Sequence, residues 1–544
     1  MKFSQRNPHP PTASTIHLAD SMGGTFLCRS IRSAVLPGRP RFLWAMACVG
    51  LIAMNIDCVG SLHADETTPQ PSPAESTTVP DAAIPAPAQP NASPEPAAEA
   101  DAPTASKPAP EPESPPATPE RKAIFDGKSL NGWTNPYEWG KVEVVDGEIH
   151  LTAERKFFLV TEKEYHDYEF EAELKLPEGK SNSGFMARGQ VQPNLVFGYQ
   201  AEADPTERRW SGGLYDESRR QWLNPLWKQS EAQAAFDRNR WNRFRIRCVG
   251  HHLQFFVNDV PTTDYFDPAD LCGRIGLQHH GEKGQTYRFR NLIVRDLGEQ
   301  EWVPLFDANT ANGKLAEGEI IPGWKSVGGG NWKVADGILQ GRASVEANEP
   351  NGLLFSTREF TNATFRIVYR YKQGDSGFFV RSKITPANPF IAGVQCEIDE
   401  TDDVAGLYQT GGKGWVAKPL HYLDTRFPPD RRDVVRYQWE QARRGLSTAE
   451  RQNHSAPASE SNDAGDANPD DANADEAKPE DAPWQTMTVS VEGKRIVTHL
   501  NDCLAADFVV DDLADSGVIA LQLHGNQNLE VDFRSIEILQ PVRK

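Results

Sequence analysis

Polar and apolar residues alternate with a period of two along most of the chain after residue 120. Clear examples are residues 167–176, 244–249 and 253–258, and the pattern returns at 361–371 and 488–491. Successive side chains of a β-strand point to opposite faces of its sheet, so this alternation predicts half-buried strands. The segments end at Gly, Pro or Asn-Asp turns, and no long pattern of helical period competes with them. We therefore expect an all-β protein with antiparallel sheets.

The same short motifs occur twice in the same order. The first set is Ser183-Gly-Phe-Met-Ala-Arg188, Gly198-Tyr-Gln-Ala-Glu-Ala-Asp204, Gly213-Leu-Tyr215 and Ile275-Gly-Leu-Gln-His-His-Gly281. The second set is Ser376-Gly-Phe-Phe-Val-Arg381, Gly393-Val-Gln-Cys-Glu-Ile-Asp399, Gly406-Leu-Tyr408 and Ile519-Ala-Leu-Gln-Leu-His-Gly525. This repetition predicts two copies of one domain, a first copy at 121–298 and a second copy at 302–540. About 175 residues per copy suit a jelly-roll β-sandwich.

The second copy carries about fifty extra residues, from roughly 426 to 483. Residues near 448–482 are mostly Asp, Asn, Ala and Pro, a composition that predicts a disordered acidic loop. Calcium binding by its aspartates is an alternative, although the spacing lacks the Gly and the terminal Glu of a known calcium loop. We expect residues 431–444 to form a short helix over the sandwich.

The N-terminal region is poor material for a hydrophobic core. Arginines at positions 29, 32, 39 and 41 precede the apolar run Phe42–Met54, which has the length of a signal h-region. Residues 1–64 therefore predict export to the periplasm or cell surface, with an uncleaved membrane anchor as the alternative. Residues 65–120 are rich in Pro, Ala, Ser, Thr and Glu, which predicts a disordered linker that would tether the folded part to a membrane or wall.

The net charge bears on the possible binding partners, and the cysteine content bears on metal sites and disulfides. The formal net charge is −19, and the sequence has no basic stripe, so we expect no nucleic-acid partner. Only four of the seven cysteines lie in the region expected to fold, without the spacing of a zinc site or a disulfide scaffold. We expect them to be small buried apolar residues, with a Cys248–Cys272 disulfide as the alternative.

A row of polar residues is kept in both copies at one expected strand. Gln200, Glu202 and Asp204 correspond to Gln395, Glu397 and Asp399. Residues two apart on a strand share a face, so each copy should present one amide and two carboxylates together. Two nearby carboxylates repel each other when both are ionised, which raises the pKa of one of them toward neutrality. Such a group would suit proton transfer. A solvated surface, a metal site or a set of hydrogen bonds to sugar hydroxyls are the alternatives.

Other polar residues are also matched between the copies. Gln278 and His280 correspond to Gln522 and His524, whereas His279 corresponds to a leucine and is assigned an inward or dispensable role. The remaining matched pairs are Arg188 with Arg381 and Tyr215 with Tyr408. They could orient hydroxyl or carbonyl groups. The alternatives are a salt bridge to the carboxylate row for each arginine and packing at the rim for each tyrosine.

Several of these motifs together resemble one family. They are Phe125-Asp-Gly-Lys-Ser-Leu-Asn-Gly-Trp133, Gly198-Tyr-Gln-Ala-Glu202, Gly213-Leu-Tyr-Asp-Glu-Ser-Arg-Arg220, Trp241-Asn-Arg-Phe-Arg-Ile246 and Gly276-Leu-Gln-His-His-Gly281. The first copy is similar along its length to the 3-keto-disaccharide hydrolase family, also catalogued as domain of unknown function 1080. The second copy resembles it from Leu305-Phe-Asp307 to Phe533-Arg-Ser-Ile536, but lacks the Asp-Glu-Ser-Arg-Arg run.

The resemblance implies two concanavalin A-like jelly rolls in an exported bacterial protein that processes 3-keto-glycosides. In that chemistry a base removes the hydrogen at C2, the C1 substituent leaves by elimination, and water adds. Glu202 or Asp204 would be the base, His280 the acid or a metal ligand, and Arg188 or Tyr215 the group that steadies the enolate. No cofactor is required, and a divalent metal is the alternative.

Two other functions stay open at this point. One is a tandem carbohydrate-binding protein without turnover, and the other is a purely structural surface protein. Because jelly rolls serve catalysis and binding alike, the expected fold does not separate them. Loss of the Asp-Glu-Ser-Arg-Arg run favours a division in which the first copy is catalytic and the second binds or regulates.

Overall fold

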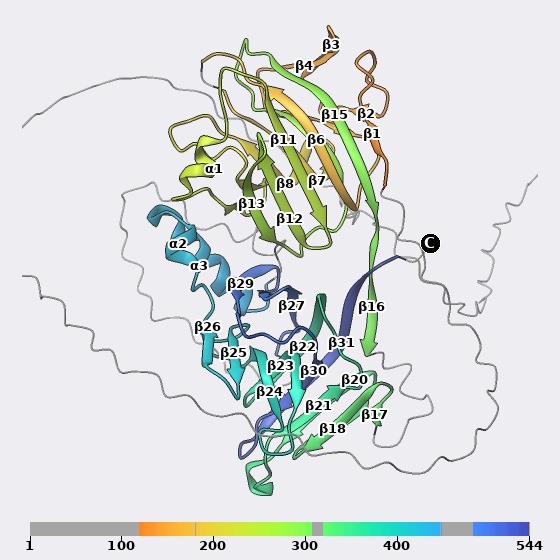
Figure 1. Ribbon diagram of the computed structural model, residues 1–544, viewed down its shortest axis with the longest axis vertical. Coiled ribbons are helices and arrows are strands. Elements are labelled where there is room, and N and C mark those ends of the chain that lie inside the picture. Colours follow the sequence, from red (N-terminus) through yellow and green to blue (C-terminus); the bar gives the residue numbers. More distant parts are fainter. Residues whose placement is uncertain (1–118, 180, 307–318, 447, 449–481, 543–544) are drawn as a thin grey trace, which may run out of the picture. The chain divides into compact units, whose positions relative to one another are not determined.

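The chain folds into two antiparallel β-sandwiches that follow one another in sequence (Figure 1). The computed structural model describes residues 119–179, 181–306, 319–446, 448 and 482–542. The predicted export signal, the Pro-rich linker and nearly all of the acidic loop lie outside these residues. Within them, no helix is long and apolar enough to cross a membrane. The all-β, jelly-roll prediction is confirmed.

The first copy has two sheets. The strands of one sheet are β1 (Arg121–Ala123), β3 (Lys141–Val145), β4 (Glu148–Thr152), β6 (Asp167–Lys175), β11 (Asn242–Val249), β12 (His252–Val257), β13 (Val260–Phe266) and β15 (Tyr287–Gly298). Their order is β13-β12-β11-β6-β15-β4-β3, and β1 pairs with β15. The pairs β3 with β4, β11 with β12 and β12 with β13 join strands consecutive in the chain, as expected for antiparallel hairpins, whereas β15 pairs with the distant β4 and β6.

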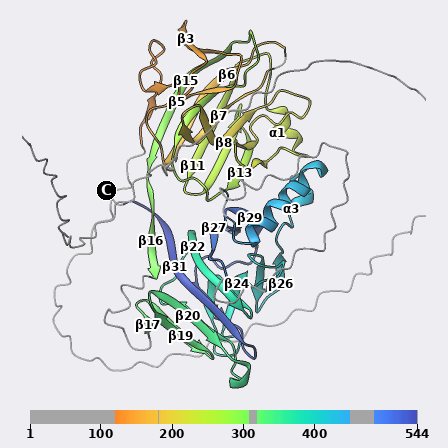
Figure 2. The ribbon, with the colours of Figure 1, turned by 180° about the vertical axis from the view of Figure 1, so that it is seen from behind.

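The opposite sheet carries the matched polar motifs, and we call it the site sheet of the first copy. Its strands are β2 (Trp133–Thr134), β5 (Phe157–Thr161), β7 (Ser183–Gln192), β8 (Leu195–Ala203), β9 (Leu214–Glu217), β10 (Gln221–Asn224) and β14 (Arg274–His279). Their order is β10-β9-β8-β7-β14-β5-β2. A short helix, α1 (Ser230–Ala234), follows β10. The long strands β7 and β8 lie side by side in both views (Figures 1 and 2).

The second copy repeats this plan. One sheet contains β16 (Gln300–Phe306), β19 (Asn331–Ala335), β20 (Ile338–Ala343), β22 (Ala363–Gln373), β27 (Gln485–Glu492), β28 (Arg495–Leu500), β29 (Cys503–Val509) and β31 (Leu529–Pro541). Its order is β19-β20-β31-β22-β27-β28-β29, with β16 paired to β31. Strand β31 therefore occupies the place that β15 has in the first copy.

The site sheet of the second copy has the order β17-β18-β21-β30-β23-β24-β25-β26. These strands are β17 (Glu319–Ile321), β18 (Trp324–Gly328), β21 (Gly352–Ser356), β23 (Ser376–Ile384), β24 (Ile391–Ile398), β25 (Leu407–Thr410), β26 (Gly414–Ala417) and β30 (Val518–Leu523). The helical elements of this copy are η2 (Val345–Ala347), α2 (Leu423–Arg426) and α3 (Pro429–Arg443). The helix predicted at 431–444 is thus confirmed as α3.

Aromatic side chains from both sheets fill the core of each sandwich. In the first copy Phe185 lies between Phe170 and Phe244, with ring centroids 5.7 and 5.0 Å away. In the second copy Phe365 and Phe378 make the equivalent contact at 5.6 Å. Such tilted or edge-to-face pairs add to the free energy gained by burial. The alternate positions of the site sheets point away from these cores.

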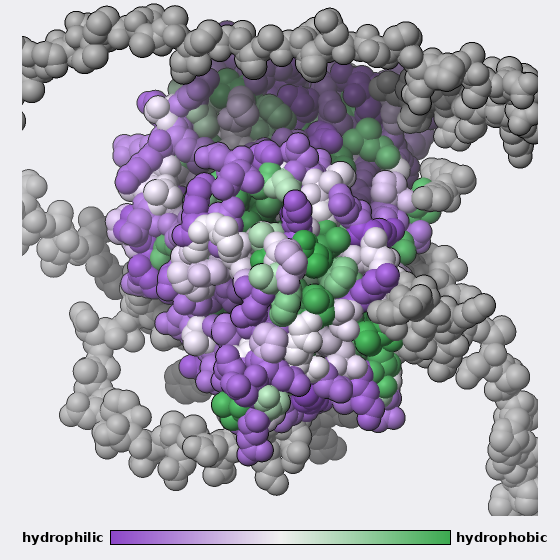
Figure 3. Space-filling view, turned by 60° about the horizontal axis from the view of Figure 1, so that its bottom comes forward, coloured by the Kyte–Doolittle hydropathy of each residue, from purple (hydrophilic) through white to green (hydrophobic). Residues whose placement is uncertain are grey.

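The four cysteines in the described residues are buried, and no disulfide joins any two of them. The prediction of small buried side chains is confirmed, and the alternative Cys248–Cys272 disulfide is wrong. The surface seen in Figure 3 is mostly hydrophilic, with hydrophobic residues interspersed. This agrees with a chain in which charged residues make up 24% of the sequence.

Candidate functional site

The site of the first copy begins with two polar residues on β8. Ala201 belongs to the apolar core, so its neighbours Gln200 and Glu202 point to the other face of the site sheet. Gly184 of β7 lies opposite Glu202, and a Cβ atom at this glycine would come within 2.7 Å of the Gln200 side chain. Glycine is needed here because the amide crosses directly over the neighbouring strand.

The Ser-Gly-Phe motif also joins two strands of each site sheet. Ser183 Oγ donates to the carbonyl oxygen of Gln278 at 2.8 Å, and Ser376 Oγ donates to that of Gln522 at 2.8 Å. Both serines are fully buried. Each bond fixes β14 or β30 beside the strand that begins at the serine, β7 or β23, so the two glutamines are held at the cluster in both copies.

Glu202 is held by two amide donors. Gln200 Nε2 donates to its Oε2 at 2.6 Å, and Asn182 Nδ2 donates to its Oε1 at 2.6 Å. Both bonds stabilise the ionised carboxylate. The side-chain oxygen of Gln200 is buried and has no hydrogen-bond partner. It is therefore an acceptor that a bound molecule could satisfy.

A second carboxylate completes the cluster. Glu217 ends β9 and forms a close ion pair with Lys156 Nζ. Gln278 Nε2 lies 3.4 Å from Glu217 Oε2, and Gln200 Nε2 lies 3.4 Å from Gln278 Oε1. The Lys156 side chain is 42% exposed, so the cluster reaches solvent at this cation.

Burial sets the protonation of the central groups. It raises the pKa of Glu202 to about 7, against the bonds from Asn182 and Gln200, while the charges of Asp204 and Glu217 raise it further. Burial likewise raises the pKa of Tyr215 to about 12, with Glu217 as the next cause. Tyr215 pairs in register with Gln200 and so faces the same side of the sheet. The cluster therefore holds a carboxyl group whose pKa lies near neutrality and a phenol that is protonated at neutral pH.

The second copy keeps part of this cluster. Gln395 Nε2 donates to Glu397 Oε1 at 2.5 Å, and burial raises the pKa of Glu397 to about 8, opposed by that bond and reinforced by the charge of Asp375. Thr410 stands at the position of Glu217, because Tyr408 pairs with Gln395 as Tyr215 pairs with Gln200.

Alignment of β21 with β5 likewise places Asn351 at the position of Lys156. The ion pair of the first copy is therefore absent from the second.

The third member of the predicted row does not join either cluster. Strands β8 and β24 end before Asp204 and Asp399, which accept hydrogen bonds from the backbone N–H groups of Thr206 and Thr401 at 3.1 Å. Asp204 also pairs with Arg208 Nη2 at 2.9 Å. Asp204 lines a cavity of about 740 Å³, and Asp399 lines one of about 580 Å³. The carboxylate of Asp204 thus holds a turn next to this cavity, and its role as a base stays a prediction.

The histidines lie at the edge of the clusters. His280 is half-exposed and its Nδ1 lies 2.9 Å from Glu282, which accepts a bond from Tyr287 at 2.6 Å. The Tyr287 oxygen in turn accepts from the Asn182 backbone N–H at 3.3 Å. His280 is thus connected to the neighbourhood of Glu202 only through these intermediates. In the second copy, His524 is exposed.

His279 packs inward, as predicted. Its ring stacks 6.0 Å from Phe157, and burial lowers its pKa. The alternation along β14 therefore separates the buried His279 from Gln278, whose side chain belongs to the cluster.

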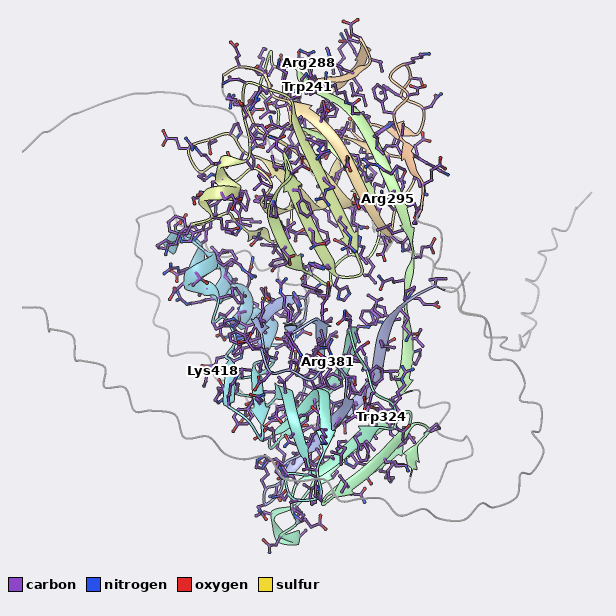
Figure 4. All side chains as sticks on the ribbon, in the orientation of Figure 1. Trp241, Arg288, Arg295, Trp324, Arg381 and Lys418 are labelled. Carbon is purple, nitrogen blue, oxygen red and sulfur yellow. The ribbon has the colours of Figure 1, made fainter. Side chains whose placement is uncertain are left out.

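The two matched arginines have a structural role, which corrects the prediction that they act on substrate. Arg188 is fully buried at a β-bulge with φ +52°, and its guanidinium donates to Asp167 and to the backbone carbonyls of His166, Gly250 and Asp270. Arg381, labelled in Figure 4, repeats this with φ +42°, bonding Asn362 and three backbone carbonyls. Their donors are occupied by loops, so they cannot steady an enolate.

Three residues of the cluster escaped the sequence prediction: Asn182, Lys156 and Glu217. Glu217 lies within the Asp-Glu-Ser-Arg-Arg run that only the first copy has. Its place in that run was the one sequence signal that could have identified Glu217. Among the described residues, no group of three or more His, Cys, Asp or Glu side chains is arranged to hold a metal ion.

Fold and site together define a protein of two jelly-roll domains with clusters of amides and carboxylates at corresponding positions, the second smaller than the first. Comparison with known protein families identifies the family to which the chain belongs. The chain belongs to the family of 3-keto-alpha-glucoside-1,2-lyase-like domains, whose model matches residues 120–295 and again 301–539. Both domains are therefore carbohydrate-related, and the resemblance seen in the motifs is confirmed.

Solved structures match parts of this chain. A putative glycosyl hydrolase from Parabacteroides distasonis has 17% identity and a TM-score of 0.26, over 32% of this chain and 94% of its own. A carbohydrate-binding module from Bacillus subtilis has 15% identity and a TM-score of 0.23, over 30% and 95%. No curated protein matches the chain. The assignment to the family rests on the two matched segments.

Proposed function

We propose that the first copy cleaves 3-keto-glycosides by elimination at C1 followed by addition of water. The observation that carries this proposal is the buried carboxyl group of Glu202, whose pKa of about 7 lies beside a second carboxylate that is neutralised by a lysine. A base with a pKa near the working pH combines a useful ionised fraction with a favourable proton affinity. Family membership supplies the substrate class.

The chemistry needs no oxidant. The C3 ketone acidifies the hydrogen at C2, and the Glu202 carboxylate takes this proton while the C2–H electron pair moves into an enolate. Collapse of the enolate expels the C1 substituent with the electrons of its bond to C1, and the departing oxygen receives a proton. Water then adds to the unsaturated keto sugar, so the sum of the steps is hydrolysis.

Other side chains of the cluster suit the remaining roles. The Lys156 ammonium has donors beyond the one directed at Glu217 and could polarise the C3 carbonyl. The Tyr215 hydroxyl stays protonated at neutral pH and could donate to the departing oxygen. Glu217 is less suited as the base because Lys156 and Ser218 both bond its Oε1 atom.

The test is turnover of a chromogenic 3-keto-glucoside and of its unoxidised parent by the wild-type chain and by Glu202→Gln. We expect release from the keto substrate alone, and a loss of about 10²- to 10⁴-fold in Glu202→Gln, the usual contribution of general base catalysis. Glu397→Gln is the matched control in the second copy and should keep full turnover. Equal turnover by wild type and Glu202→Gln would refute the proposal.

A further inference from the structure

The two copies differ in the exposure of one matched tryptophan. Trp222 of β10 pairs with Tyr215, and Trp415 of β26 pairs with Tyr408. Trp222 is 6% exposed because Trp210 and Leu226 pack around it, whereas Trp415 is 38% exposed. The tryptophan at this position is therefore buried in the first copy and exposed to solvent in the second.

Trp415 continues a row of matched side chains across the site sheet. Phe379, Gln395, Tyr408 and Trp415 are successive partners in register on β23, β24, β25 and β26. Partners in register share one face of a sheet, so the indole and the Gln395 amide flank Tyr408. The Tyr408 and Trp415 rings meet edge to face at 5.5 Å, and the ammonium of Lys418, labelled in Figure 4, lies 4.7 Å from the indole centroid. These contacts fix the ring without burying it.

Beside this row, two buried amides point unused acceptors at the cluster. Gln395 and Gln522 are 6% and 3% exposed, and the Oε1 atom of each has no hydrogen-bond partner. A buried carbonyl oxygen without a donor costs free energy, so a ligand that supplies donors would stabilise the site. Hydroxyl groups supply such donors, whereas a ketone oxygen only accepts.

The groups around the cluster disfavour an anion and do not provide a metal site. The charges of Asp375 and Asp399 already raise the pKa of Glu397, and an anion bound beside these carboxyl groups would meet the same repulsion, so an anionic ligand is disfavoured. A metal ion lacks a suitable group of ligands within the described part of the chain. Neither Lys156 nor Glu217 has an ionic counterpart here, since Asn351 and Thr410 take their places. A neutral polyhydroxylated molecule fits these groups, because its hydroxyl groups can donate to the unpartnered oxygens of Gln395 and Gln522.

We infer that the second copy is a saccharide-binding domain without turnover, in which Trp415 stacks on the apolar face of a pyranose ring while Gln395, Gln522 and Glu397 bind its hydroxyl groups. The ligand class is a neutral saccharide that keeps all its hydroxyls, unlike the 3-keto substrate proposed for the first copy. This inference goes beyond the proposed function and holds whether or not the first copy is catalytic.

The test is isothermal titration of the whole chain with neutral oligosaccharides, using cellotriose, maltotriose, mannotriose and xylotriose as probes. We expect at least one to bind. Trp415→Ala should weaken that binding about tenfold, in line with the value of a well-placed aromatic contact. Trp415→Phe keeps a ring and should restore part of the affinity. Gln522→Ala should also weaken binding, because it removes a buried acceptor.

The controls separate this inference from the proposed catalysis. Glu217→Gln in the first copy should leave saccharide binding unchanged, and Trp415→Ala should leave turnover of the 3-keto-glucoside unchanged. A thermal melt of each variant checks that it is folded. The inference is overturned if none of the four probes binds at concentrations up to about 10 mM. That is tenfold above a Kd of about 1 mM, the weak end of specific affinity. It is also overturned if Trp415→Ala leaves the binding intact.

Discussion

Asn182→Asp tests how the first copy sets the ionisation of Glu202. Asn182 Nδ2 donates to Glu202 Oε1 at 2.6 Å, and the second copy has Asp375 at the same position. The substitution removes a donor and adds a carboxylate, and both changes disfavour the ionised form of Glu202. The pKa of Glu202 must therefore rise. The variant reproduces in the first copy an arrangement that the second copy already has.

The size of the shift follows from the bond that is lost. A hydrogen bond to a charged group contributes about 1.5–3 kcal/mol, and about 1.4 kcal/mol corresponds to one pKa unit, so we expect a rise of about 1–2 units. The added charge acts in the same direction. Glu202 would move from about 7 to at least the value of about 8 that Glu397 has beside Asp375.

The assay is the pH dependence of kcat/KM for the 3-keto-glucoside between about pH 5 and 10, which reports the pKa of the base in the free enzyme. Because the base acts only when ionised, the rising limb should shift to higher pH by about 1–2 units, with activity at pH 7 about tenfold lower and largely recovered at high pH. Asn291→Asp is the control. Asn291 is exposed, so this substitution adds the same charge at a position away from the cluster. A limb that stays where it is in the wild type would refute the assignment of Glu202 as the base.

Three further predictions concern the same cluster and its support. Lys156→Met should lower kcat about 10²- to 10³-fold by removing a preorganised cation, while Lys283→Met, an exposed ion-pair residue, should not; steady-state kinetics decides. Burial raises the pKa of Glu202 from 4.5 to about 7, so its contribution to stability is present below pH 4.5 and is lost as pH rises through 7. Urea unfolding should show a fall of up to about 3 kcal/mol across that range in the wild type, and Glu202→Gln should remove this part of the fall. Arg188→Met should cost about 3–5 kcal/mol in the same measurement by leaving Asp167 unpaired and buried, and an unchanged unfolding free energy would contradict the structural role.

Most of the fold could be predicted from the sequence because each sandwich buries one face of every strand. The period-two alternation in β6, for example, records that burial residue by residue. The order of strands within the sheets was not predictable in this way. It depends on long-range pairs such as β6 with β15, which leave no periodic signal in either strand.

The comparison of the two copies identified part of the cluster and also selected residues that serve the fold. It selected Gln200, Glu202 and Gln278, which the structure brings together in one cluster, and the bond from Gln200 to Glu202 recurs between Gln395 and Glu397. It also selected Arg188, because the β-bulge that this residue occupies is needed by the fold in both copies. It missed Glu217, whose counterpart is a threonine. A residue kept in both copies can serve the fold, and a residue needed for catalysis in one copy need not be kept.

The paired losses in the second copy form the stronger argument for a division of function. Lys156 and Glu217 neutralise each other in the first copy, so loss of only one would leave an unpaired charge near a buried carboxyl group. In the second copy both positions are neutral, as Asn351 and Thr410, while the glutamine pair, the buried glutamate and the tyrosine are kept. The groups that are lost are those suited to stabilising charge that develops during a reaction. The groups that are kept suit a neutral ligand, and the exposed Trp415 beside them is what such a ligand would use.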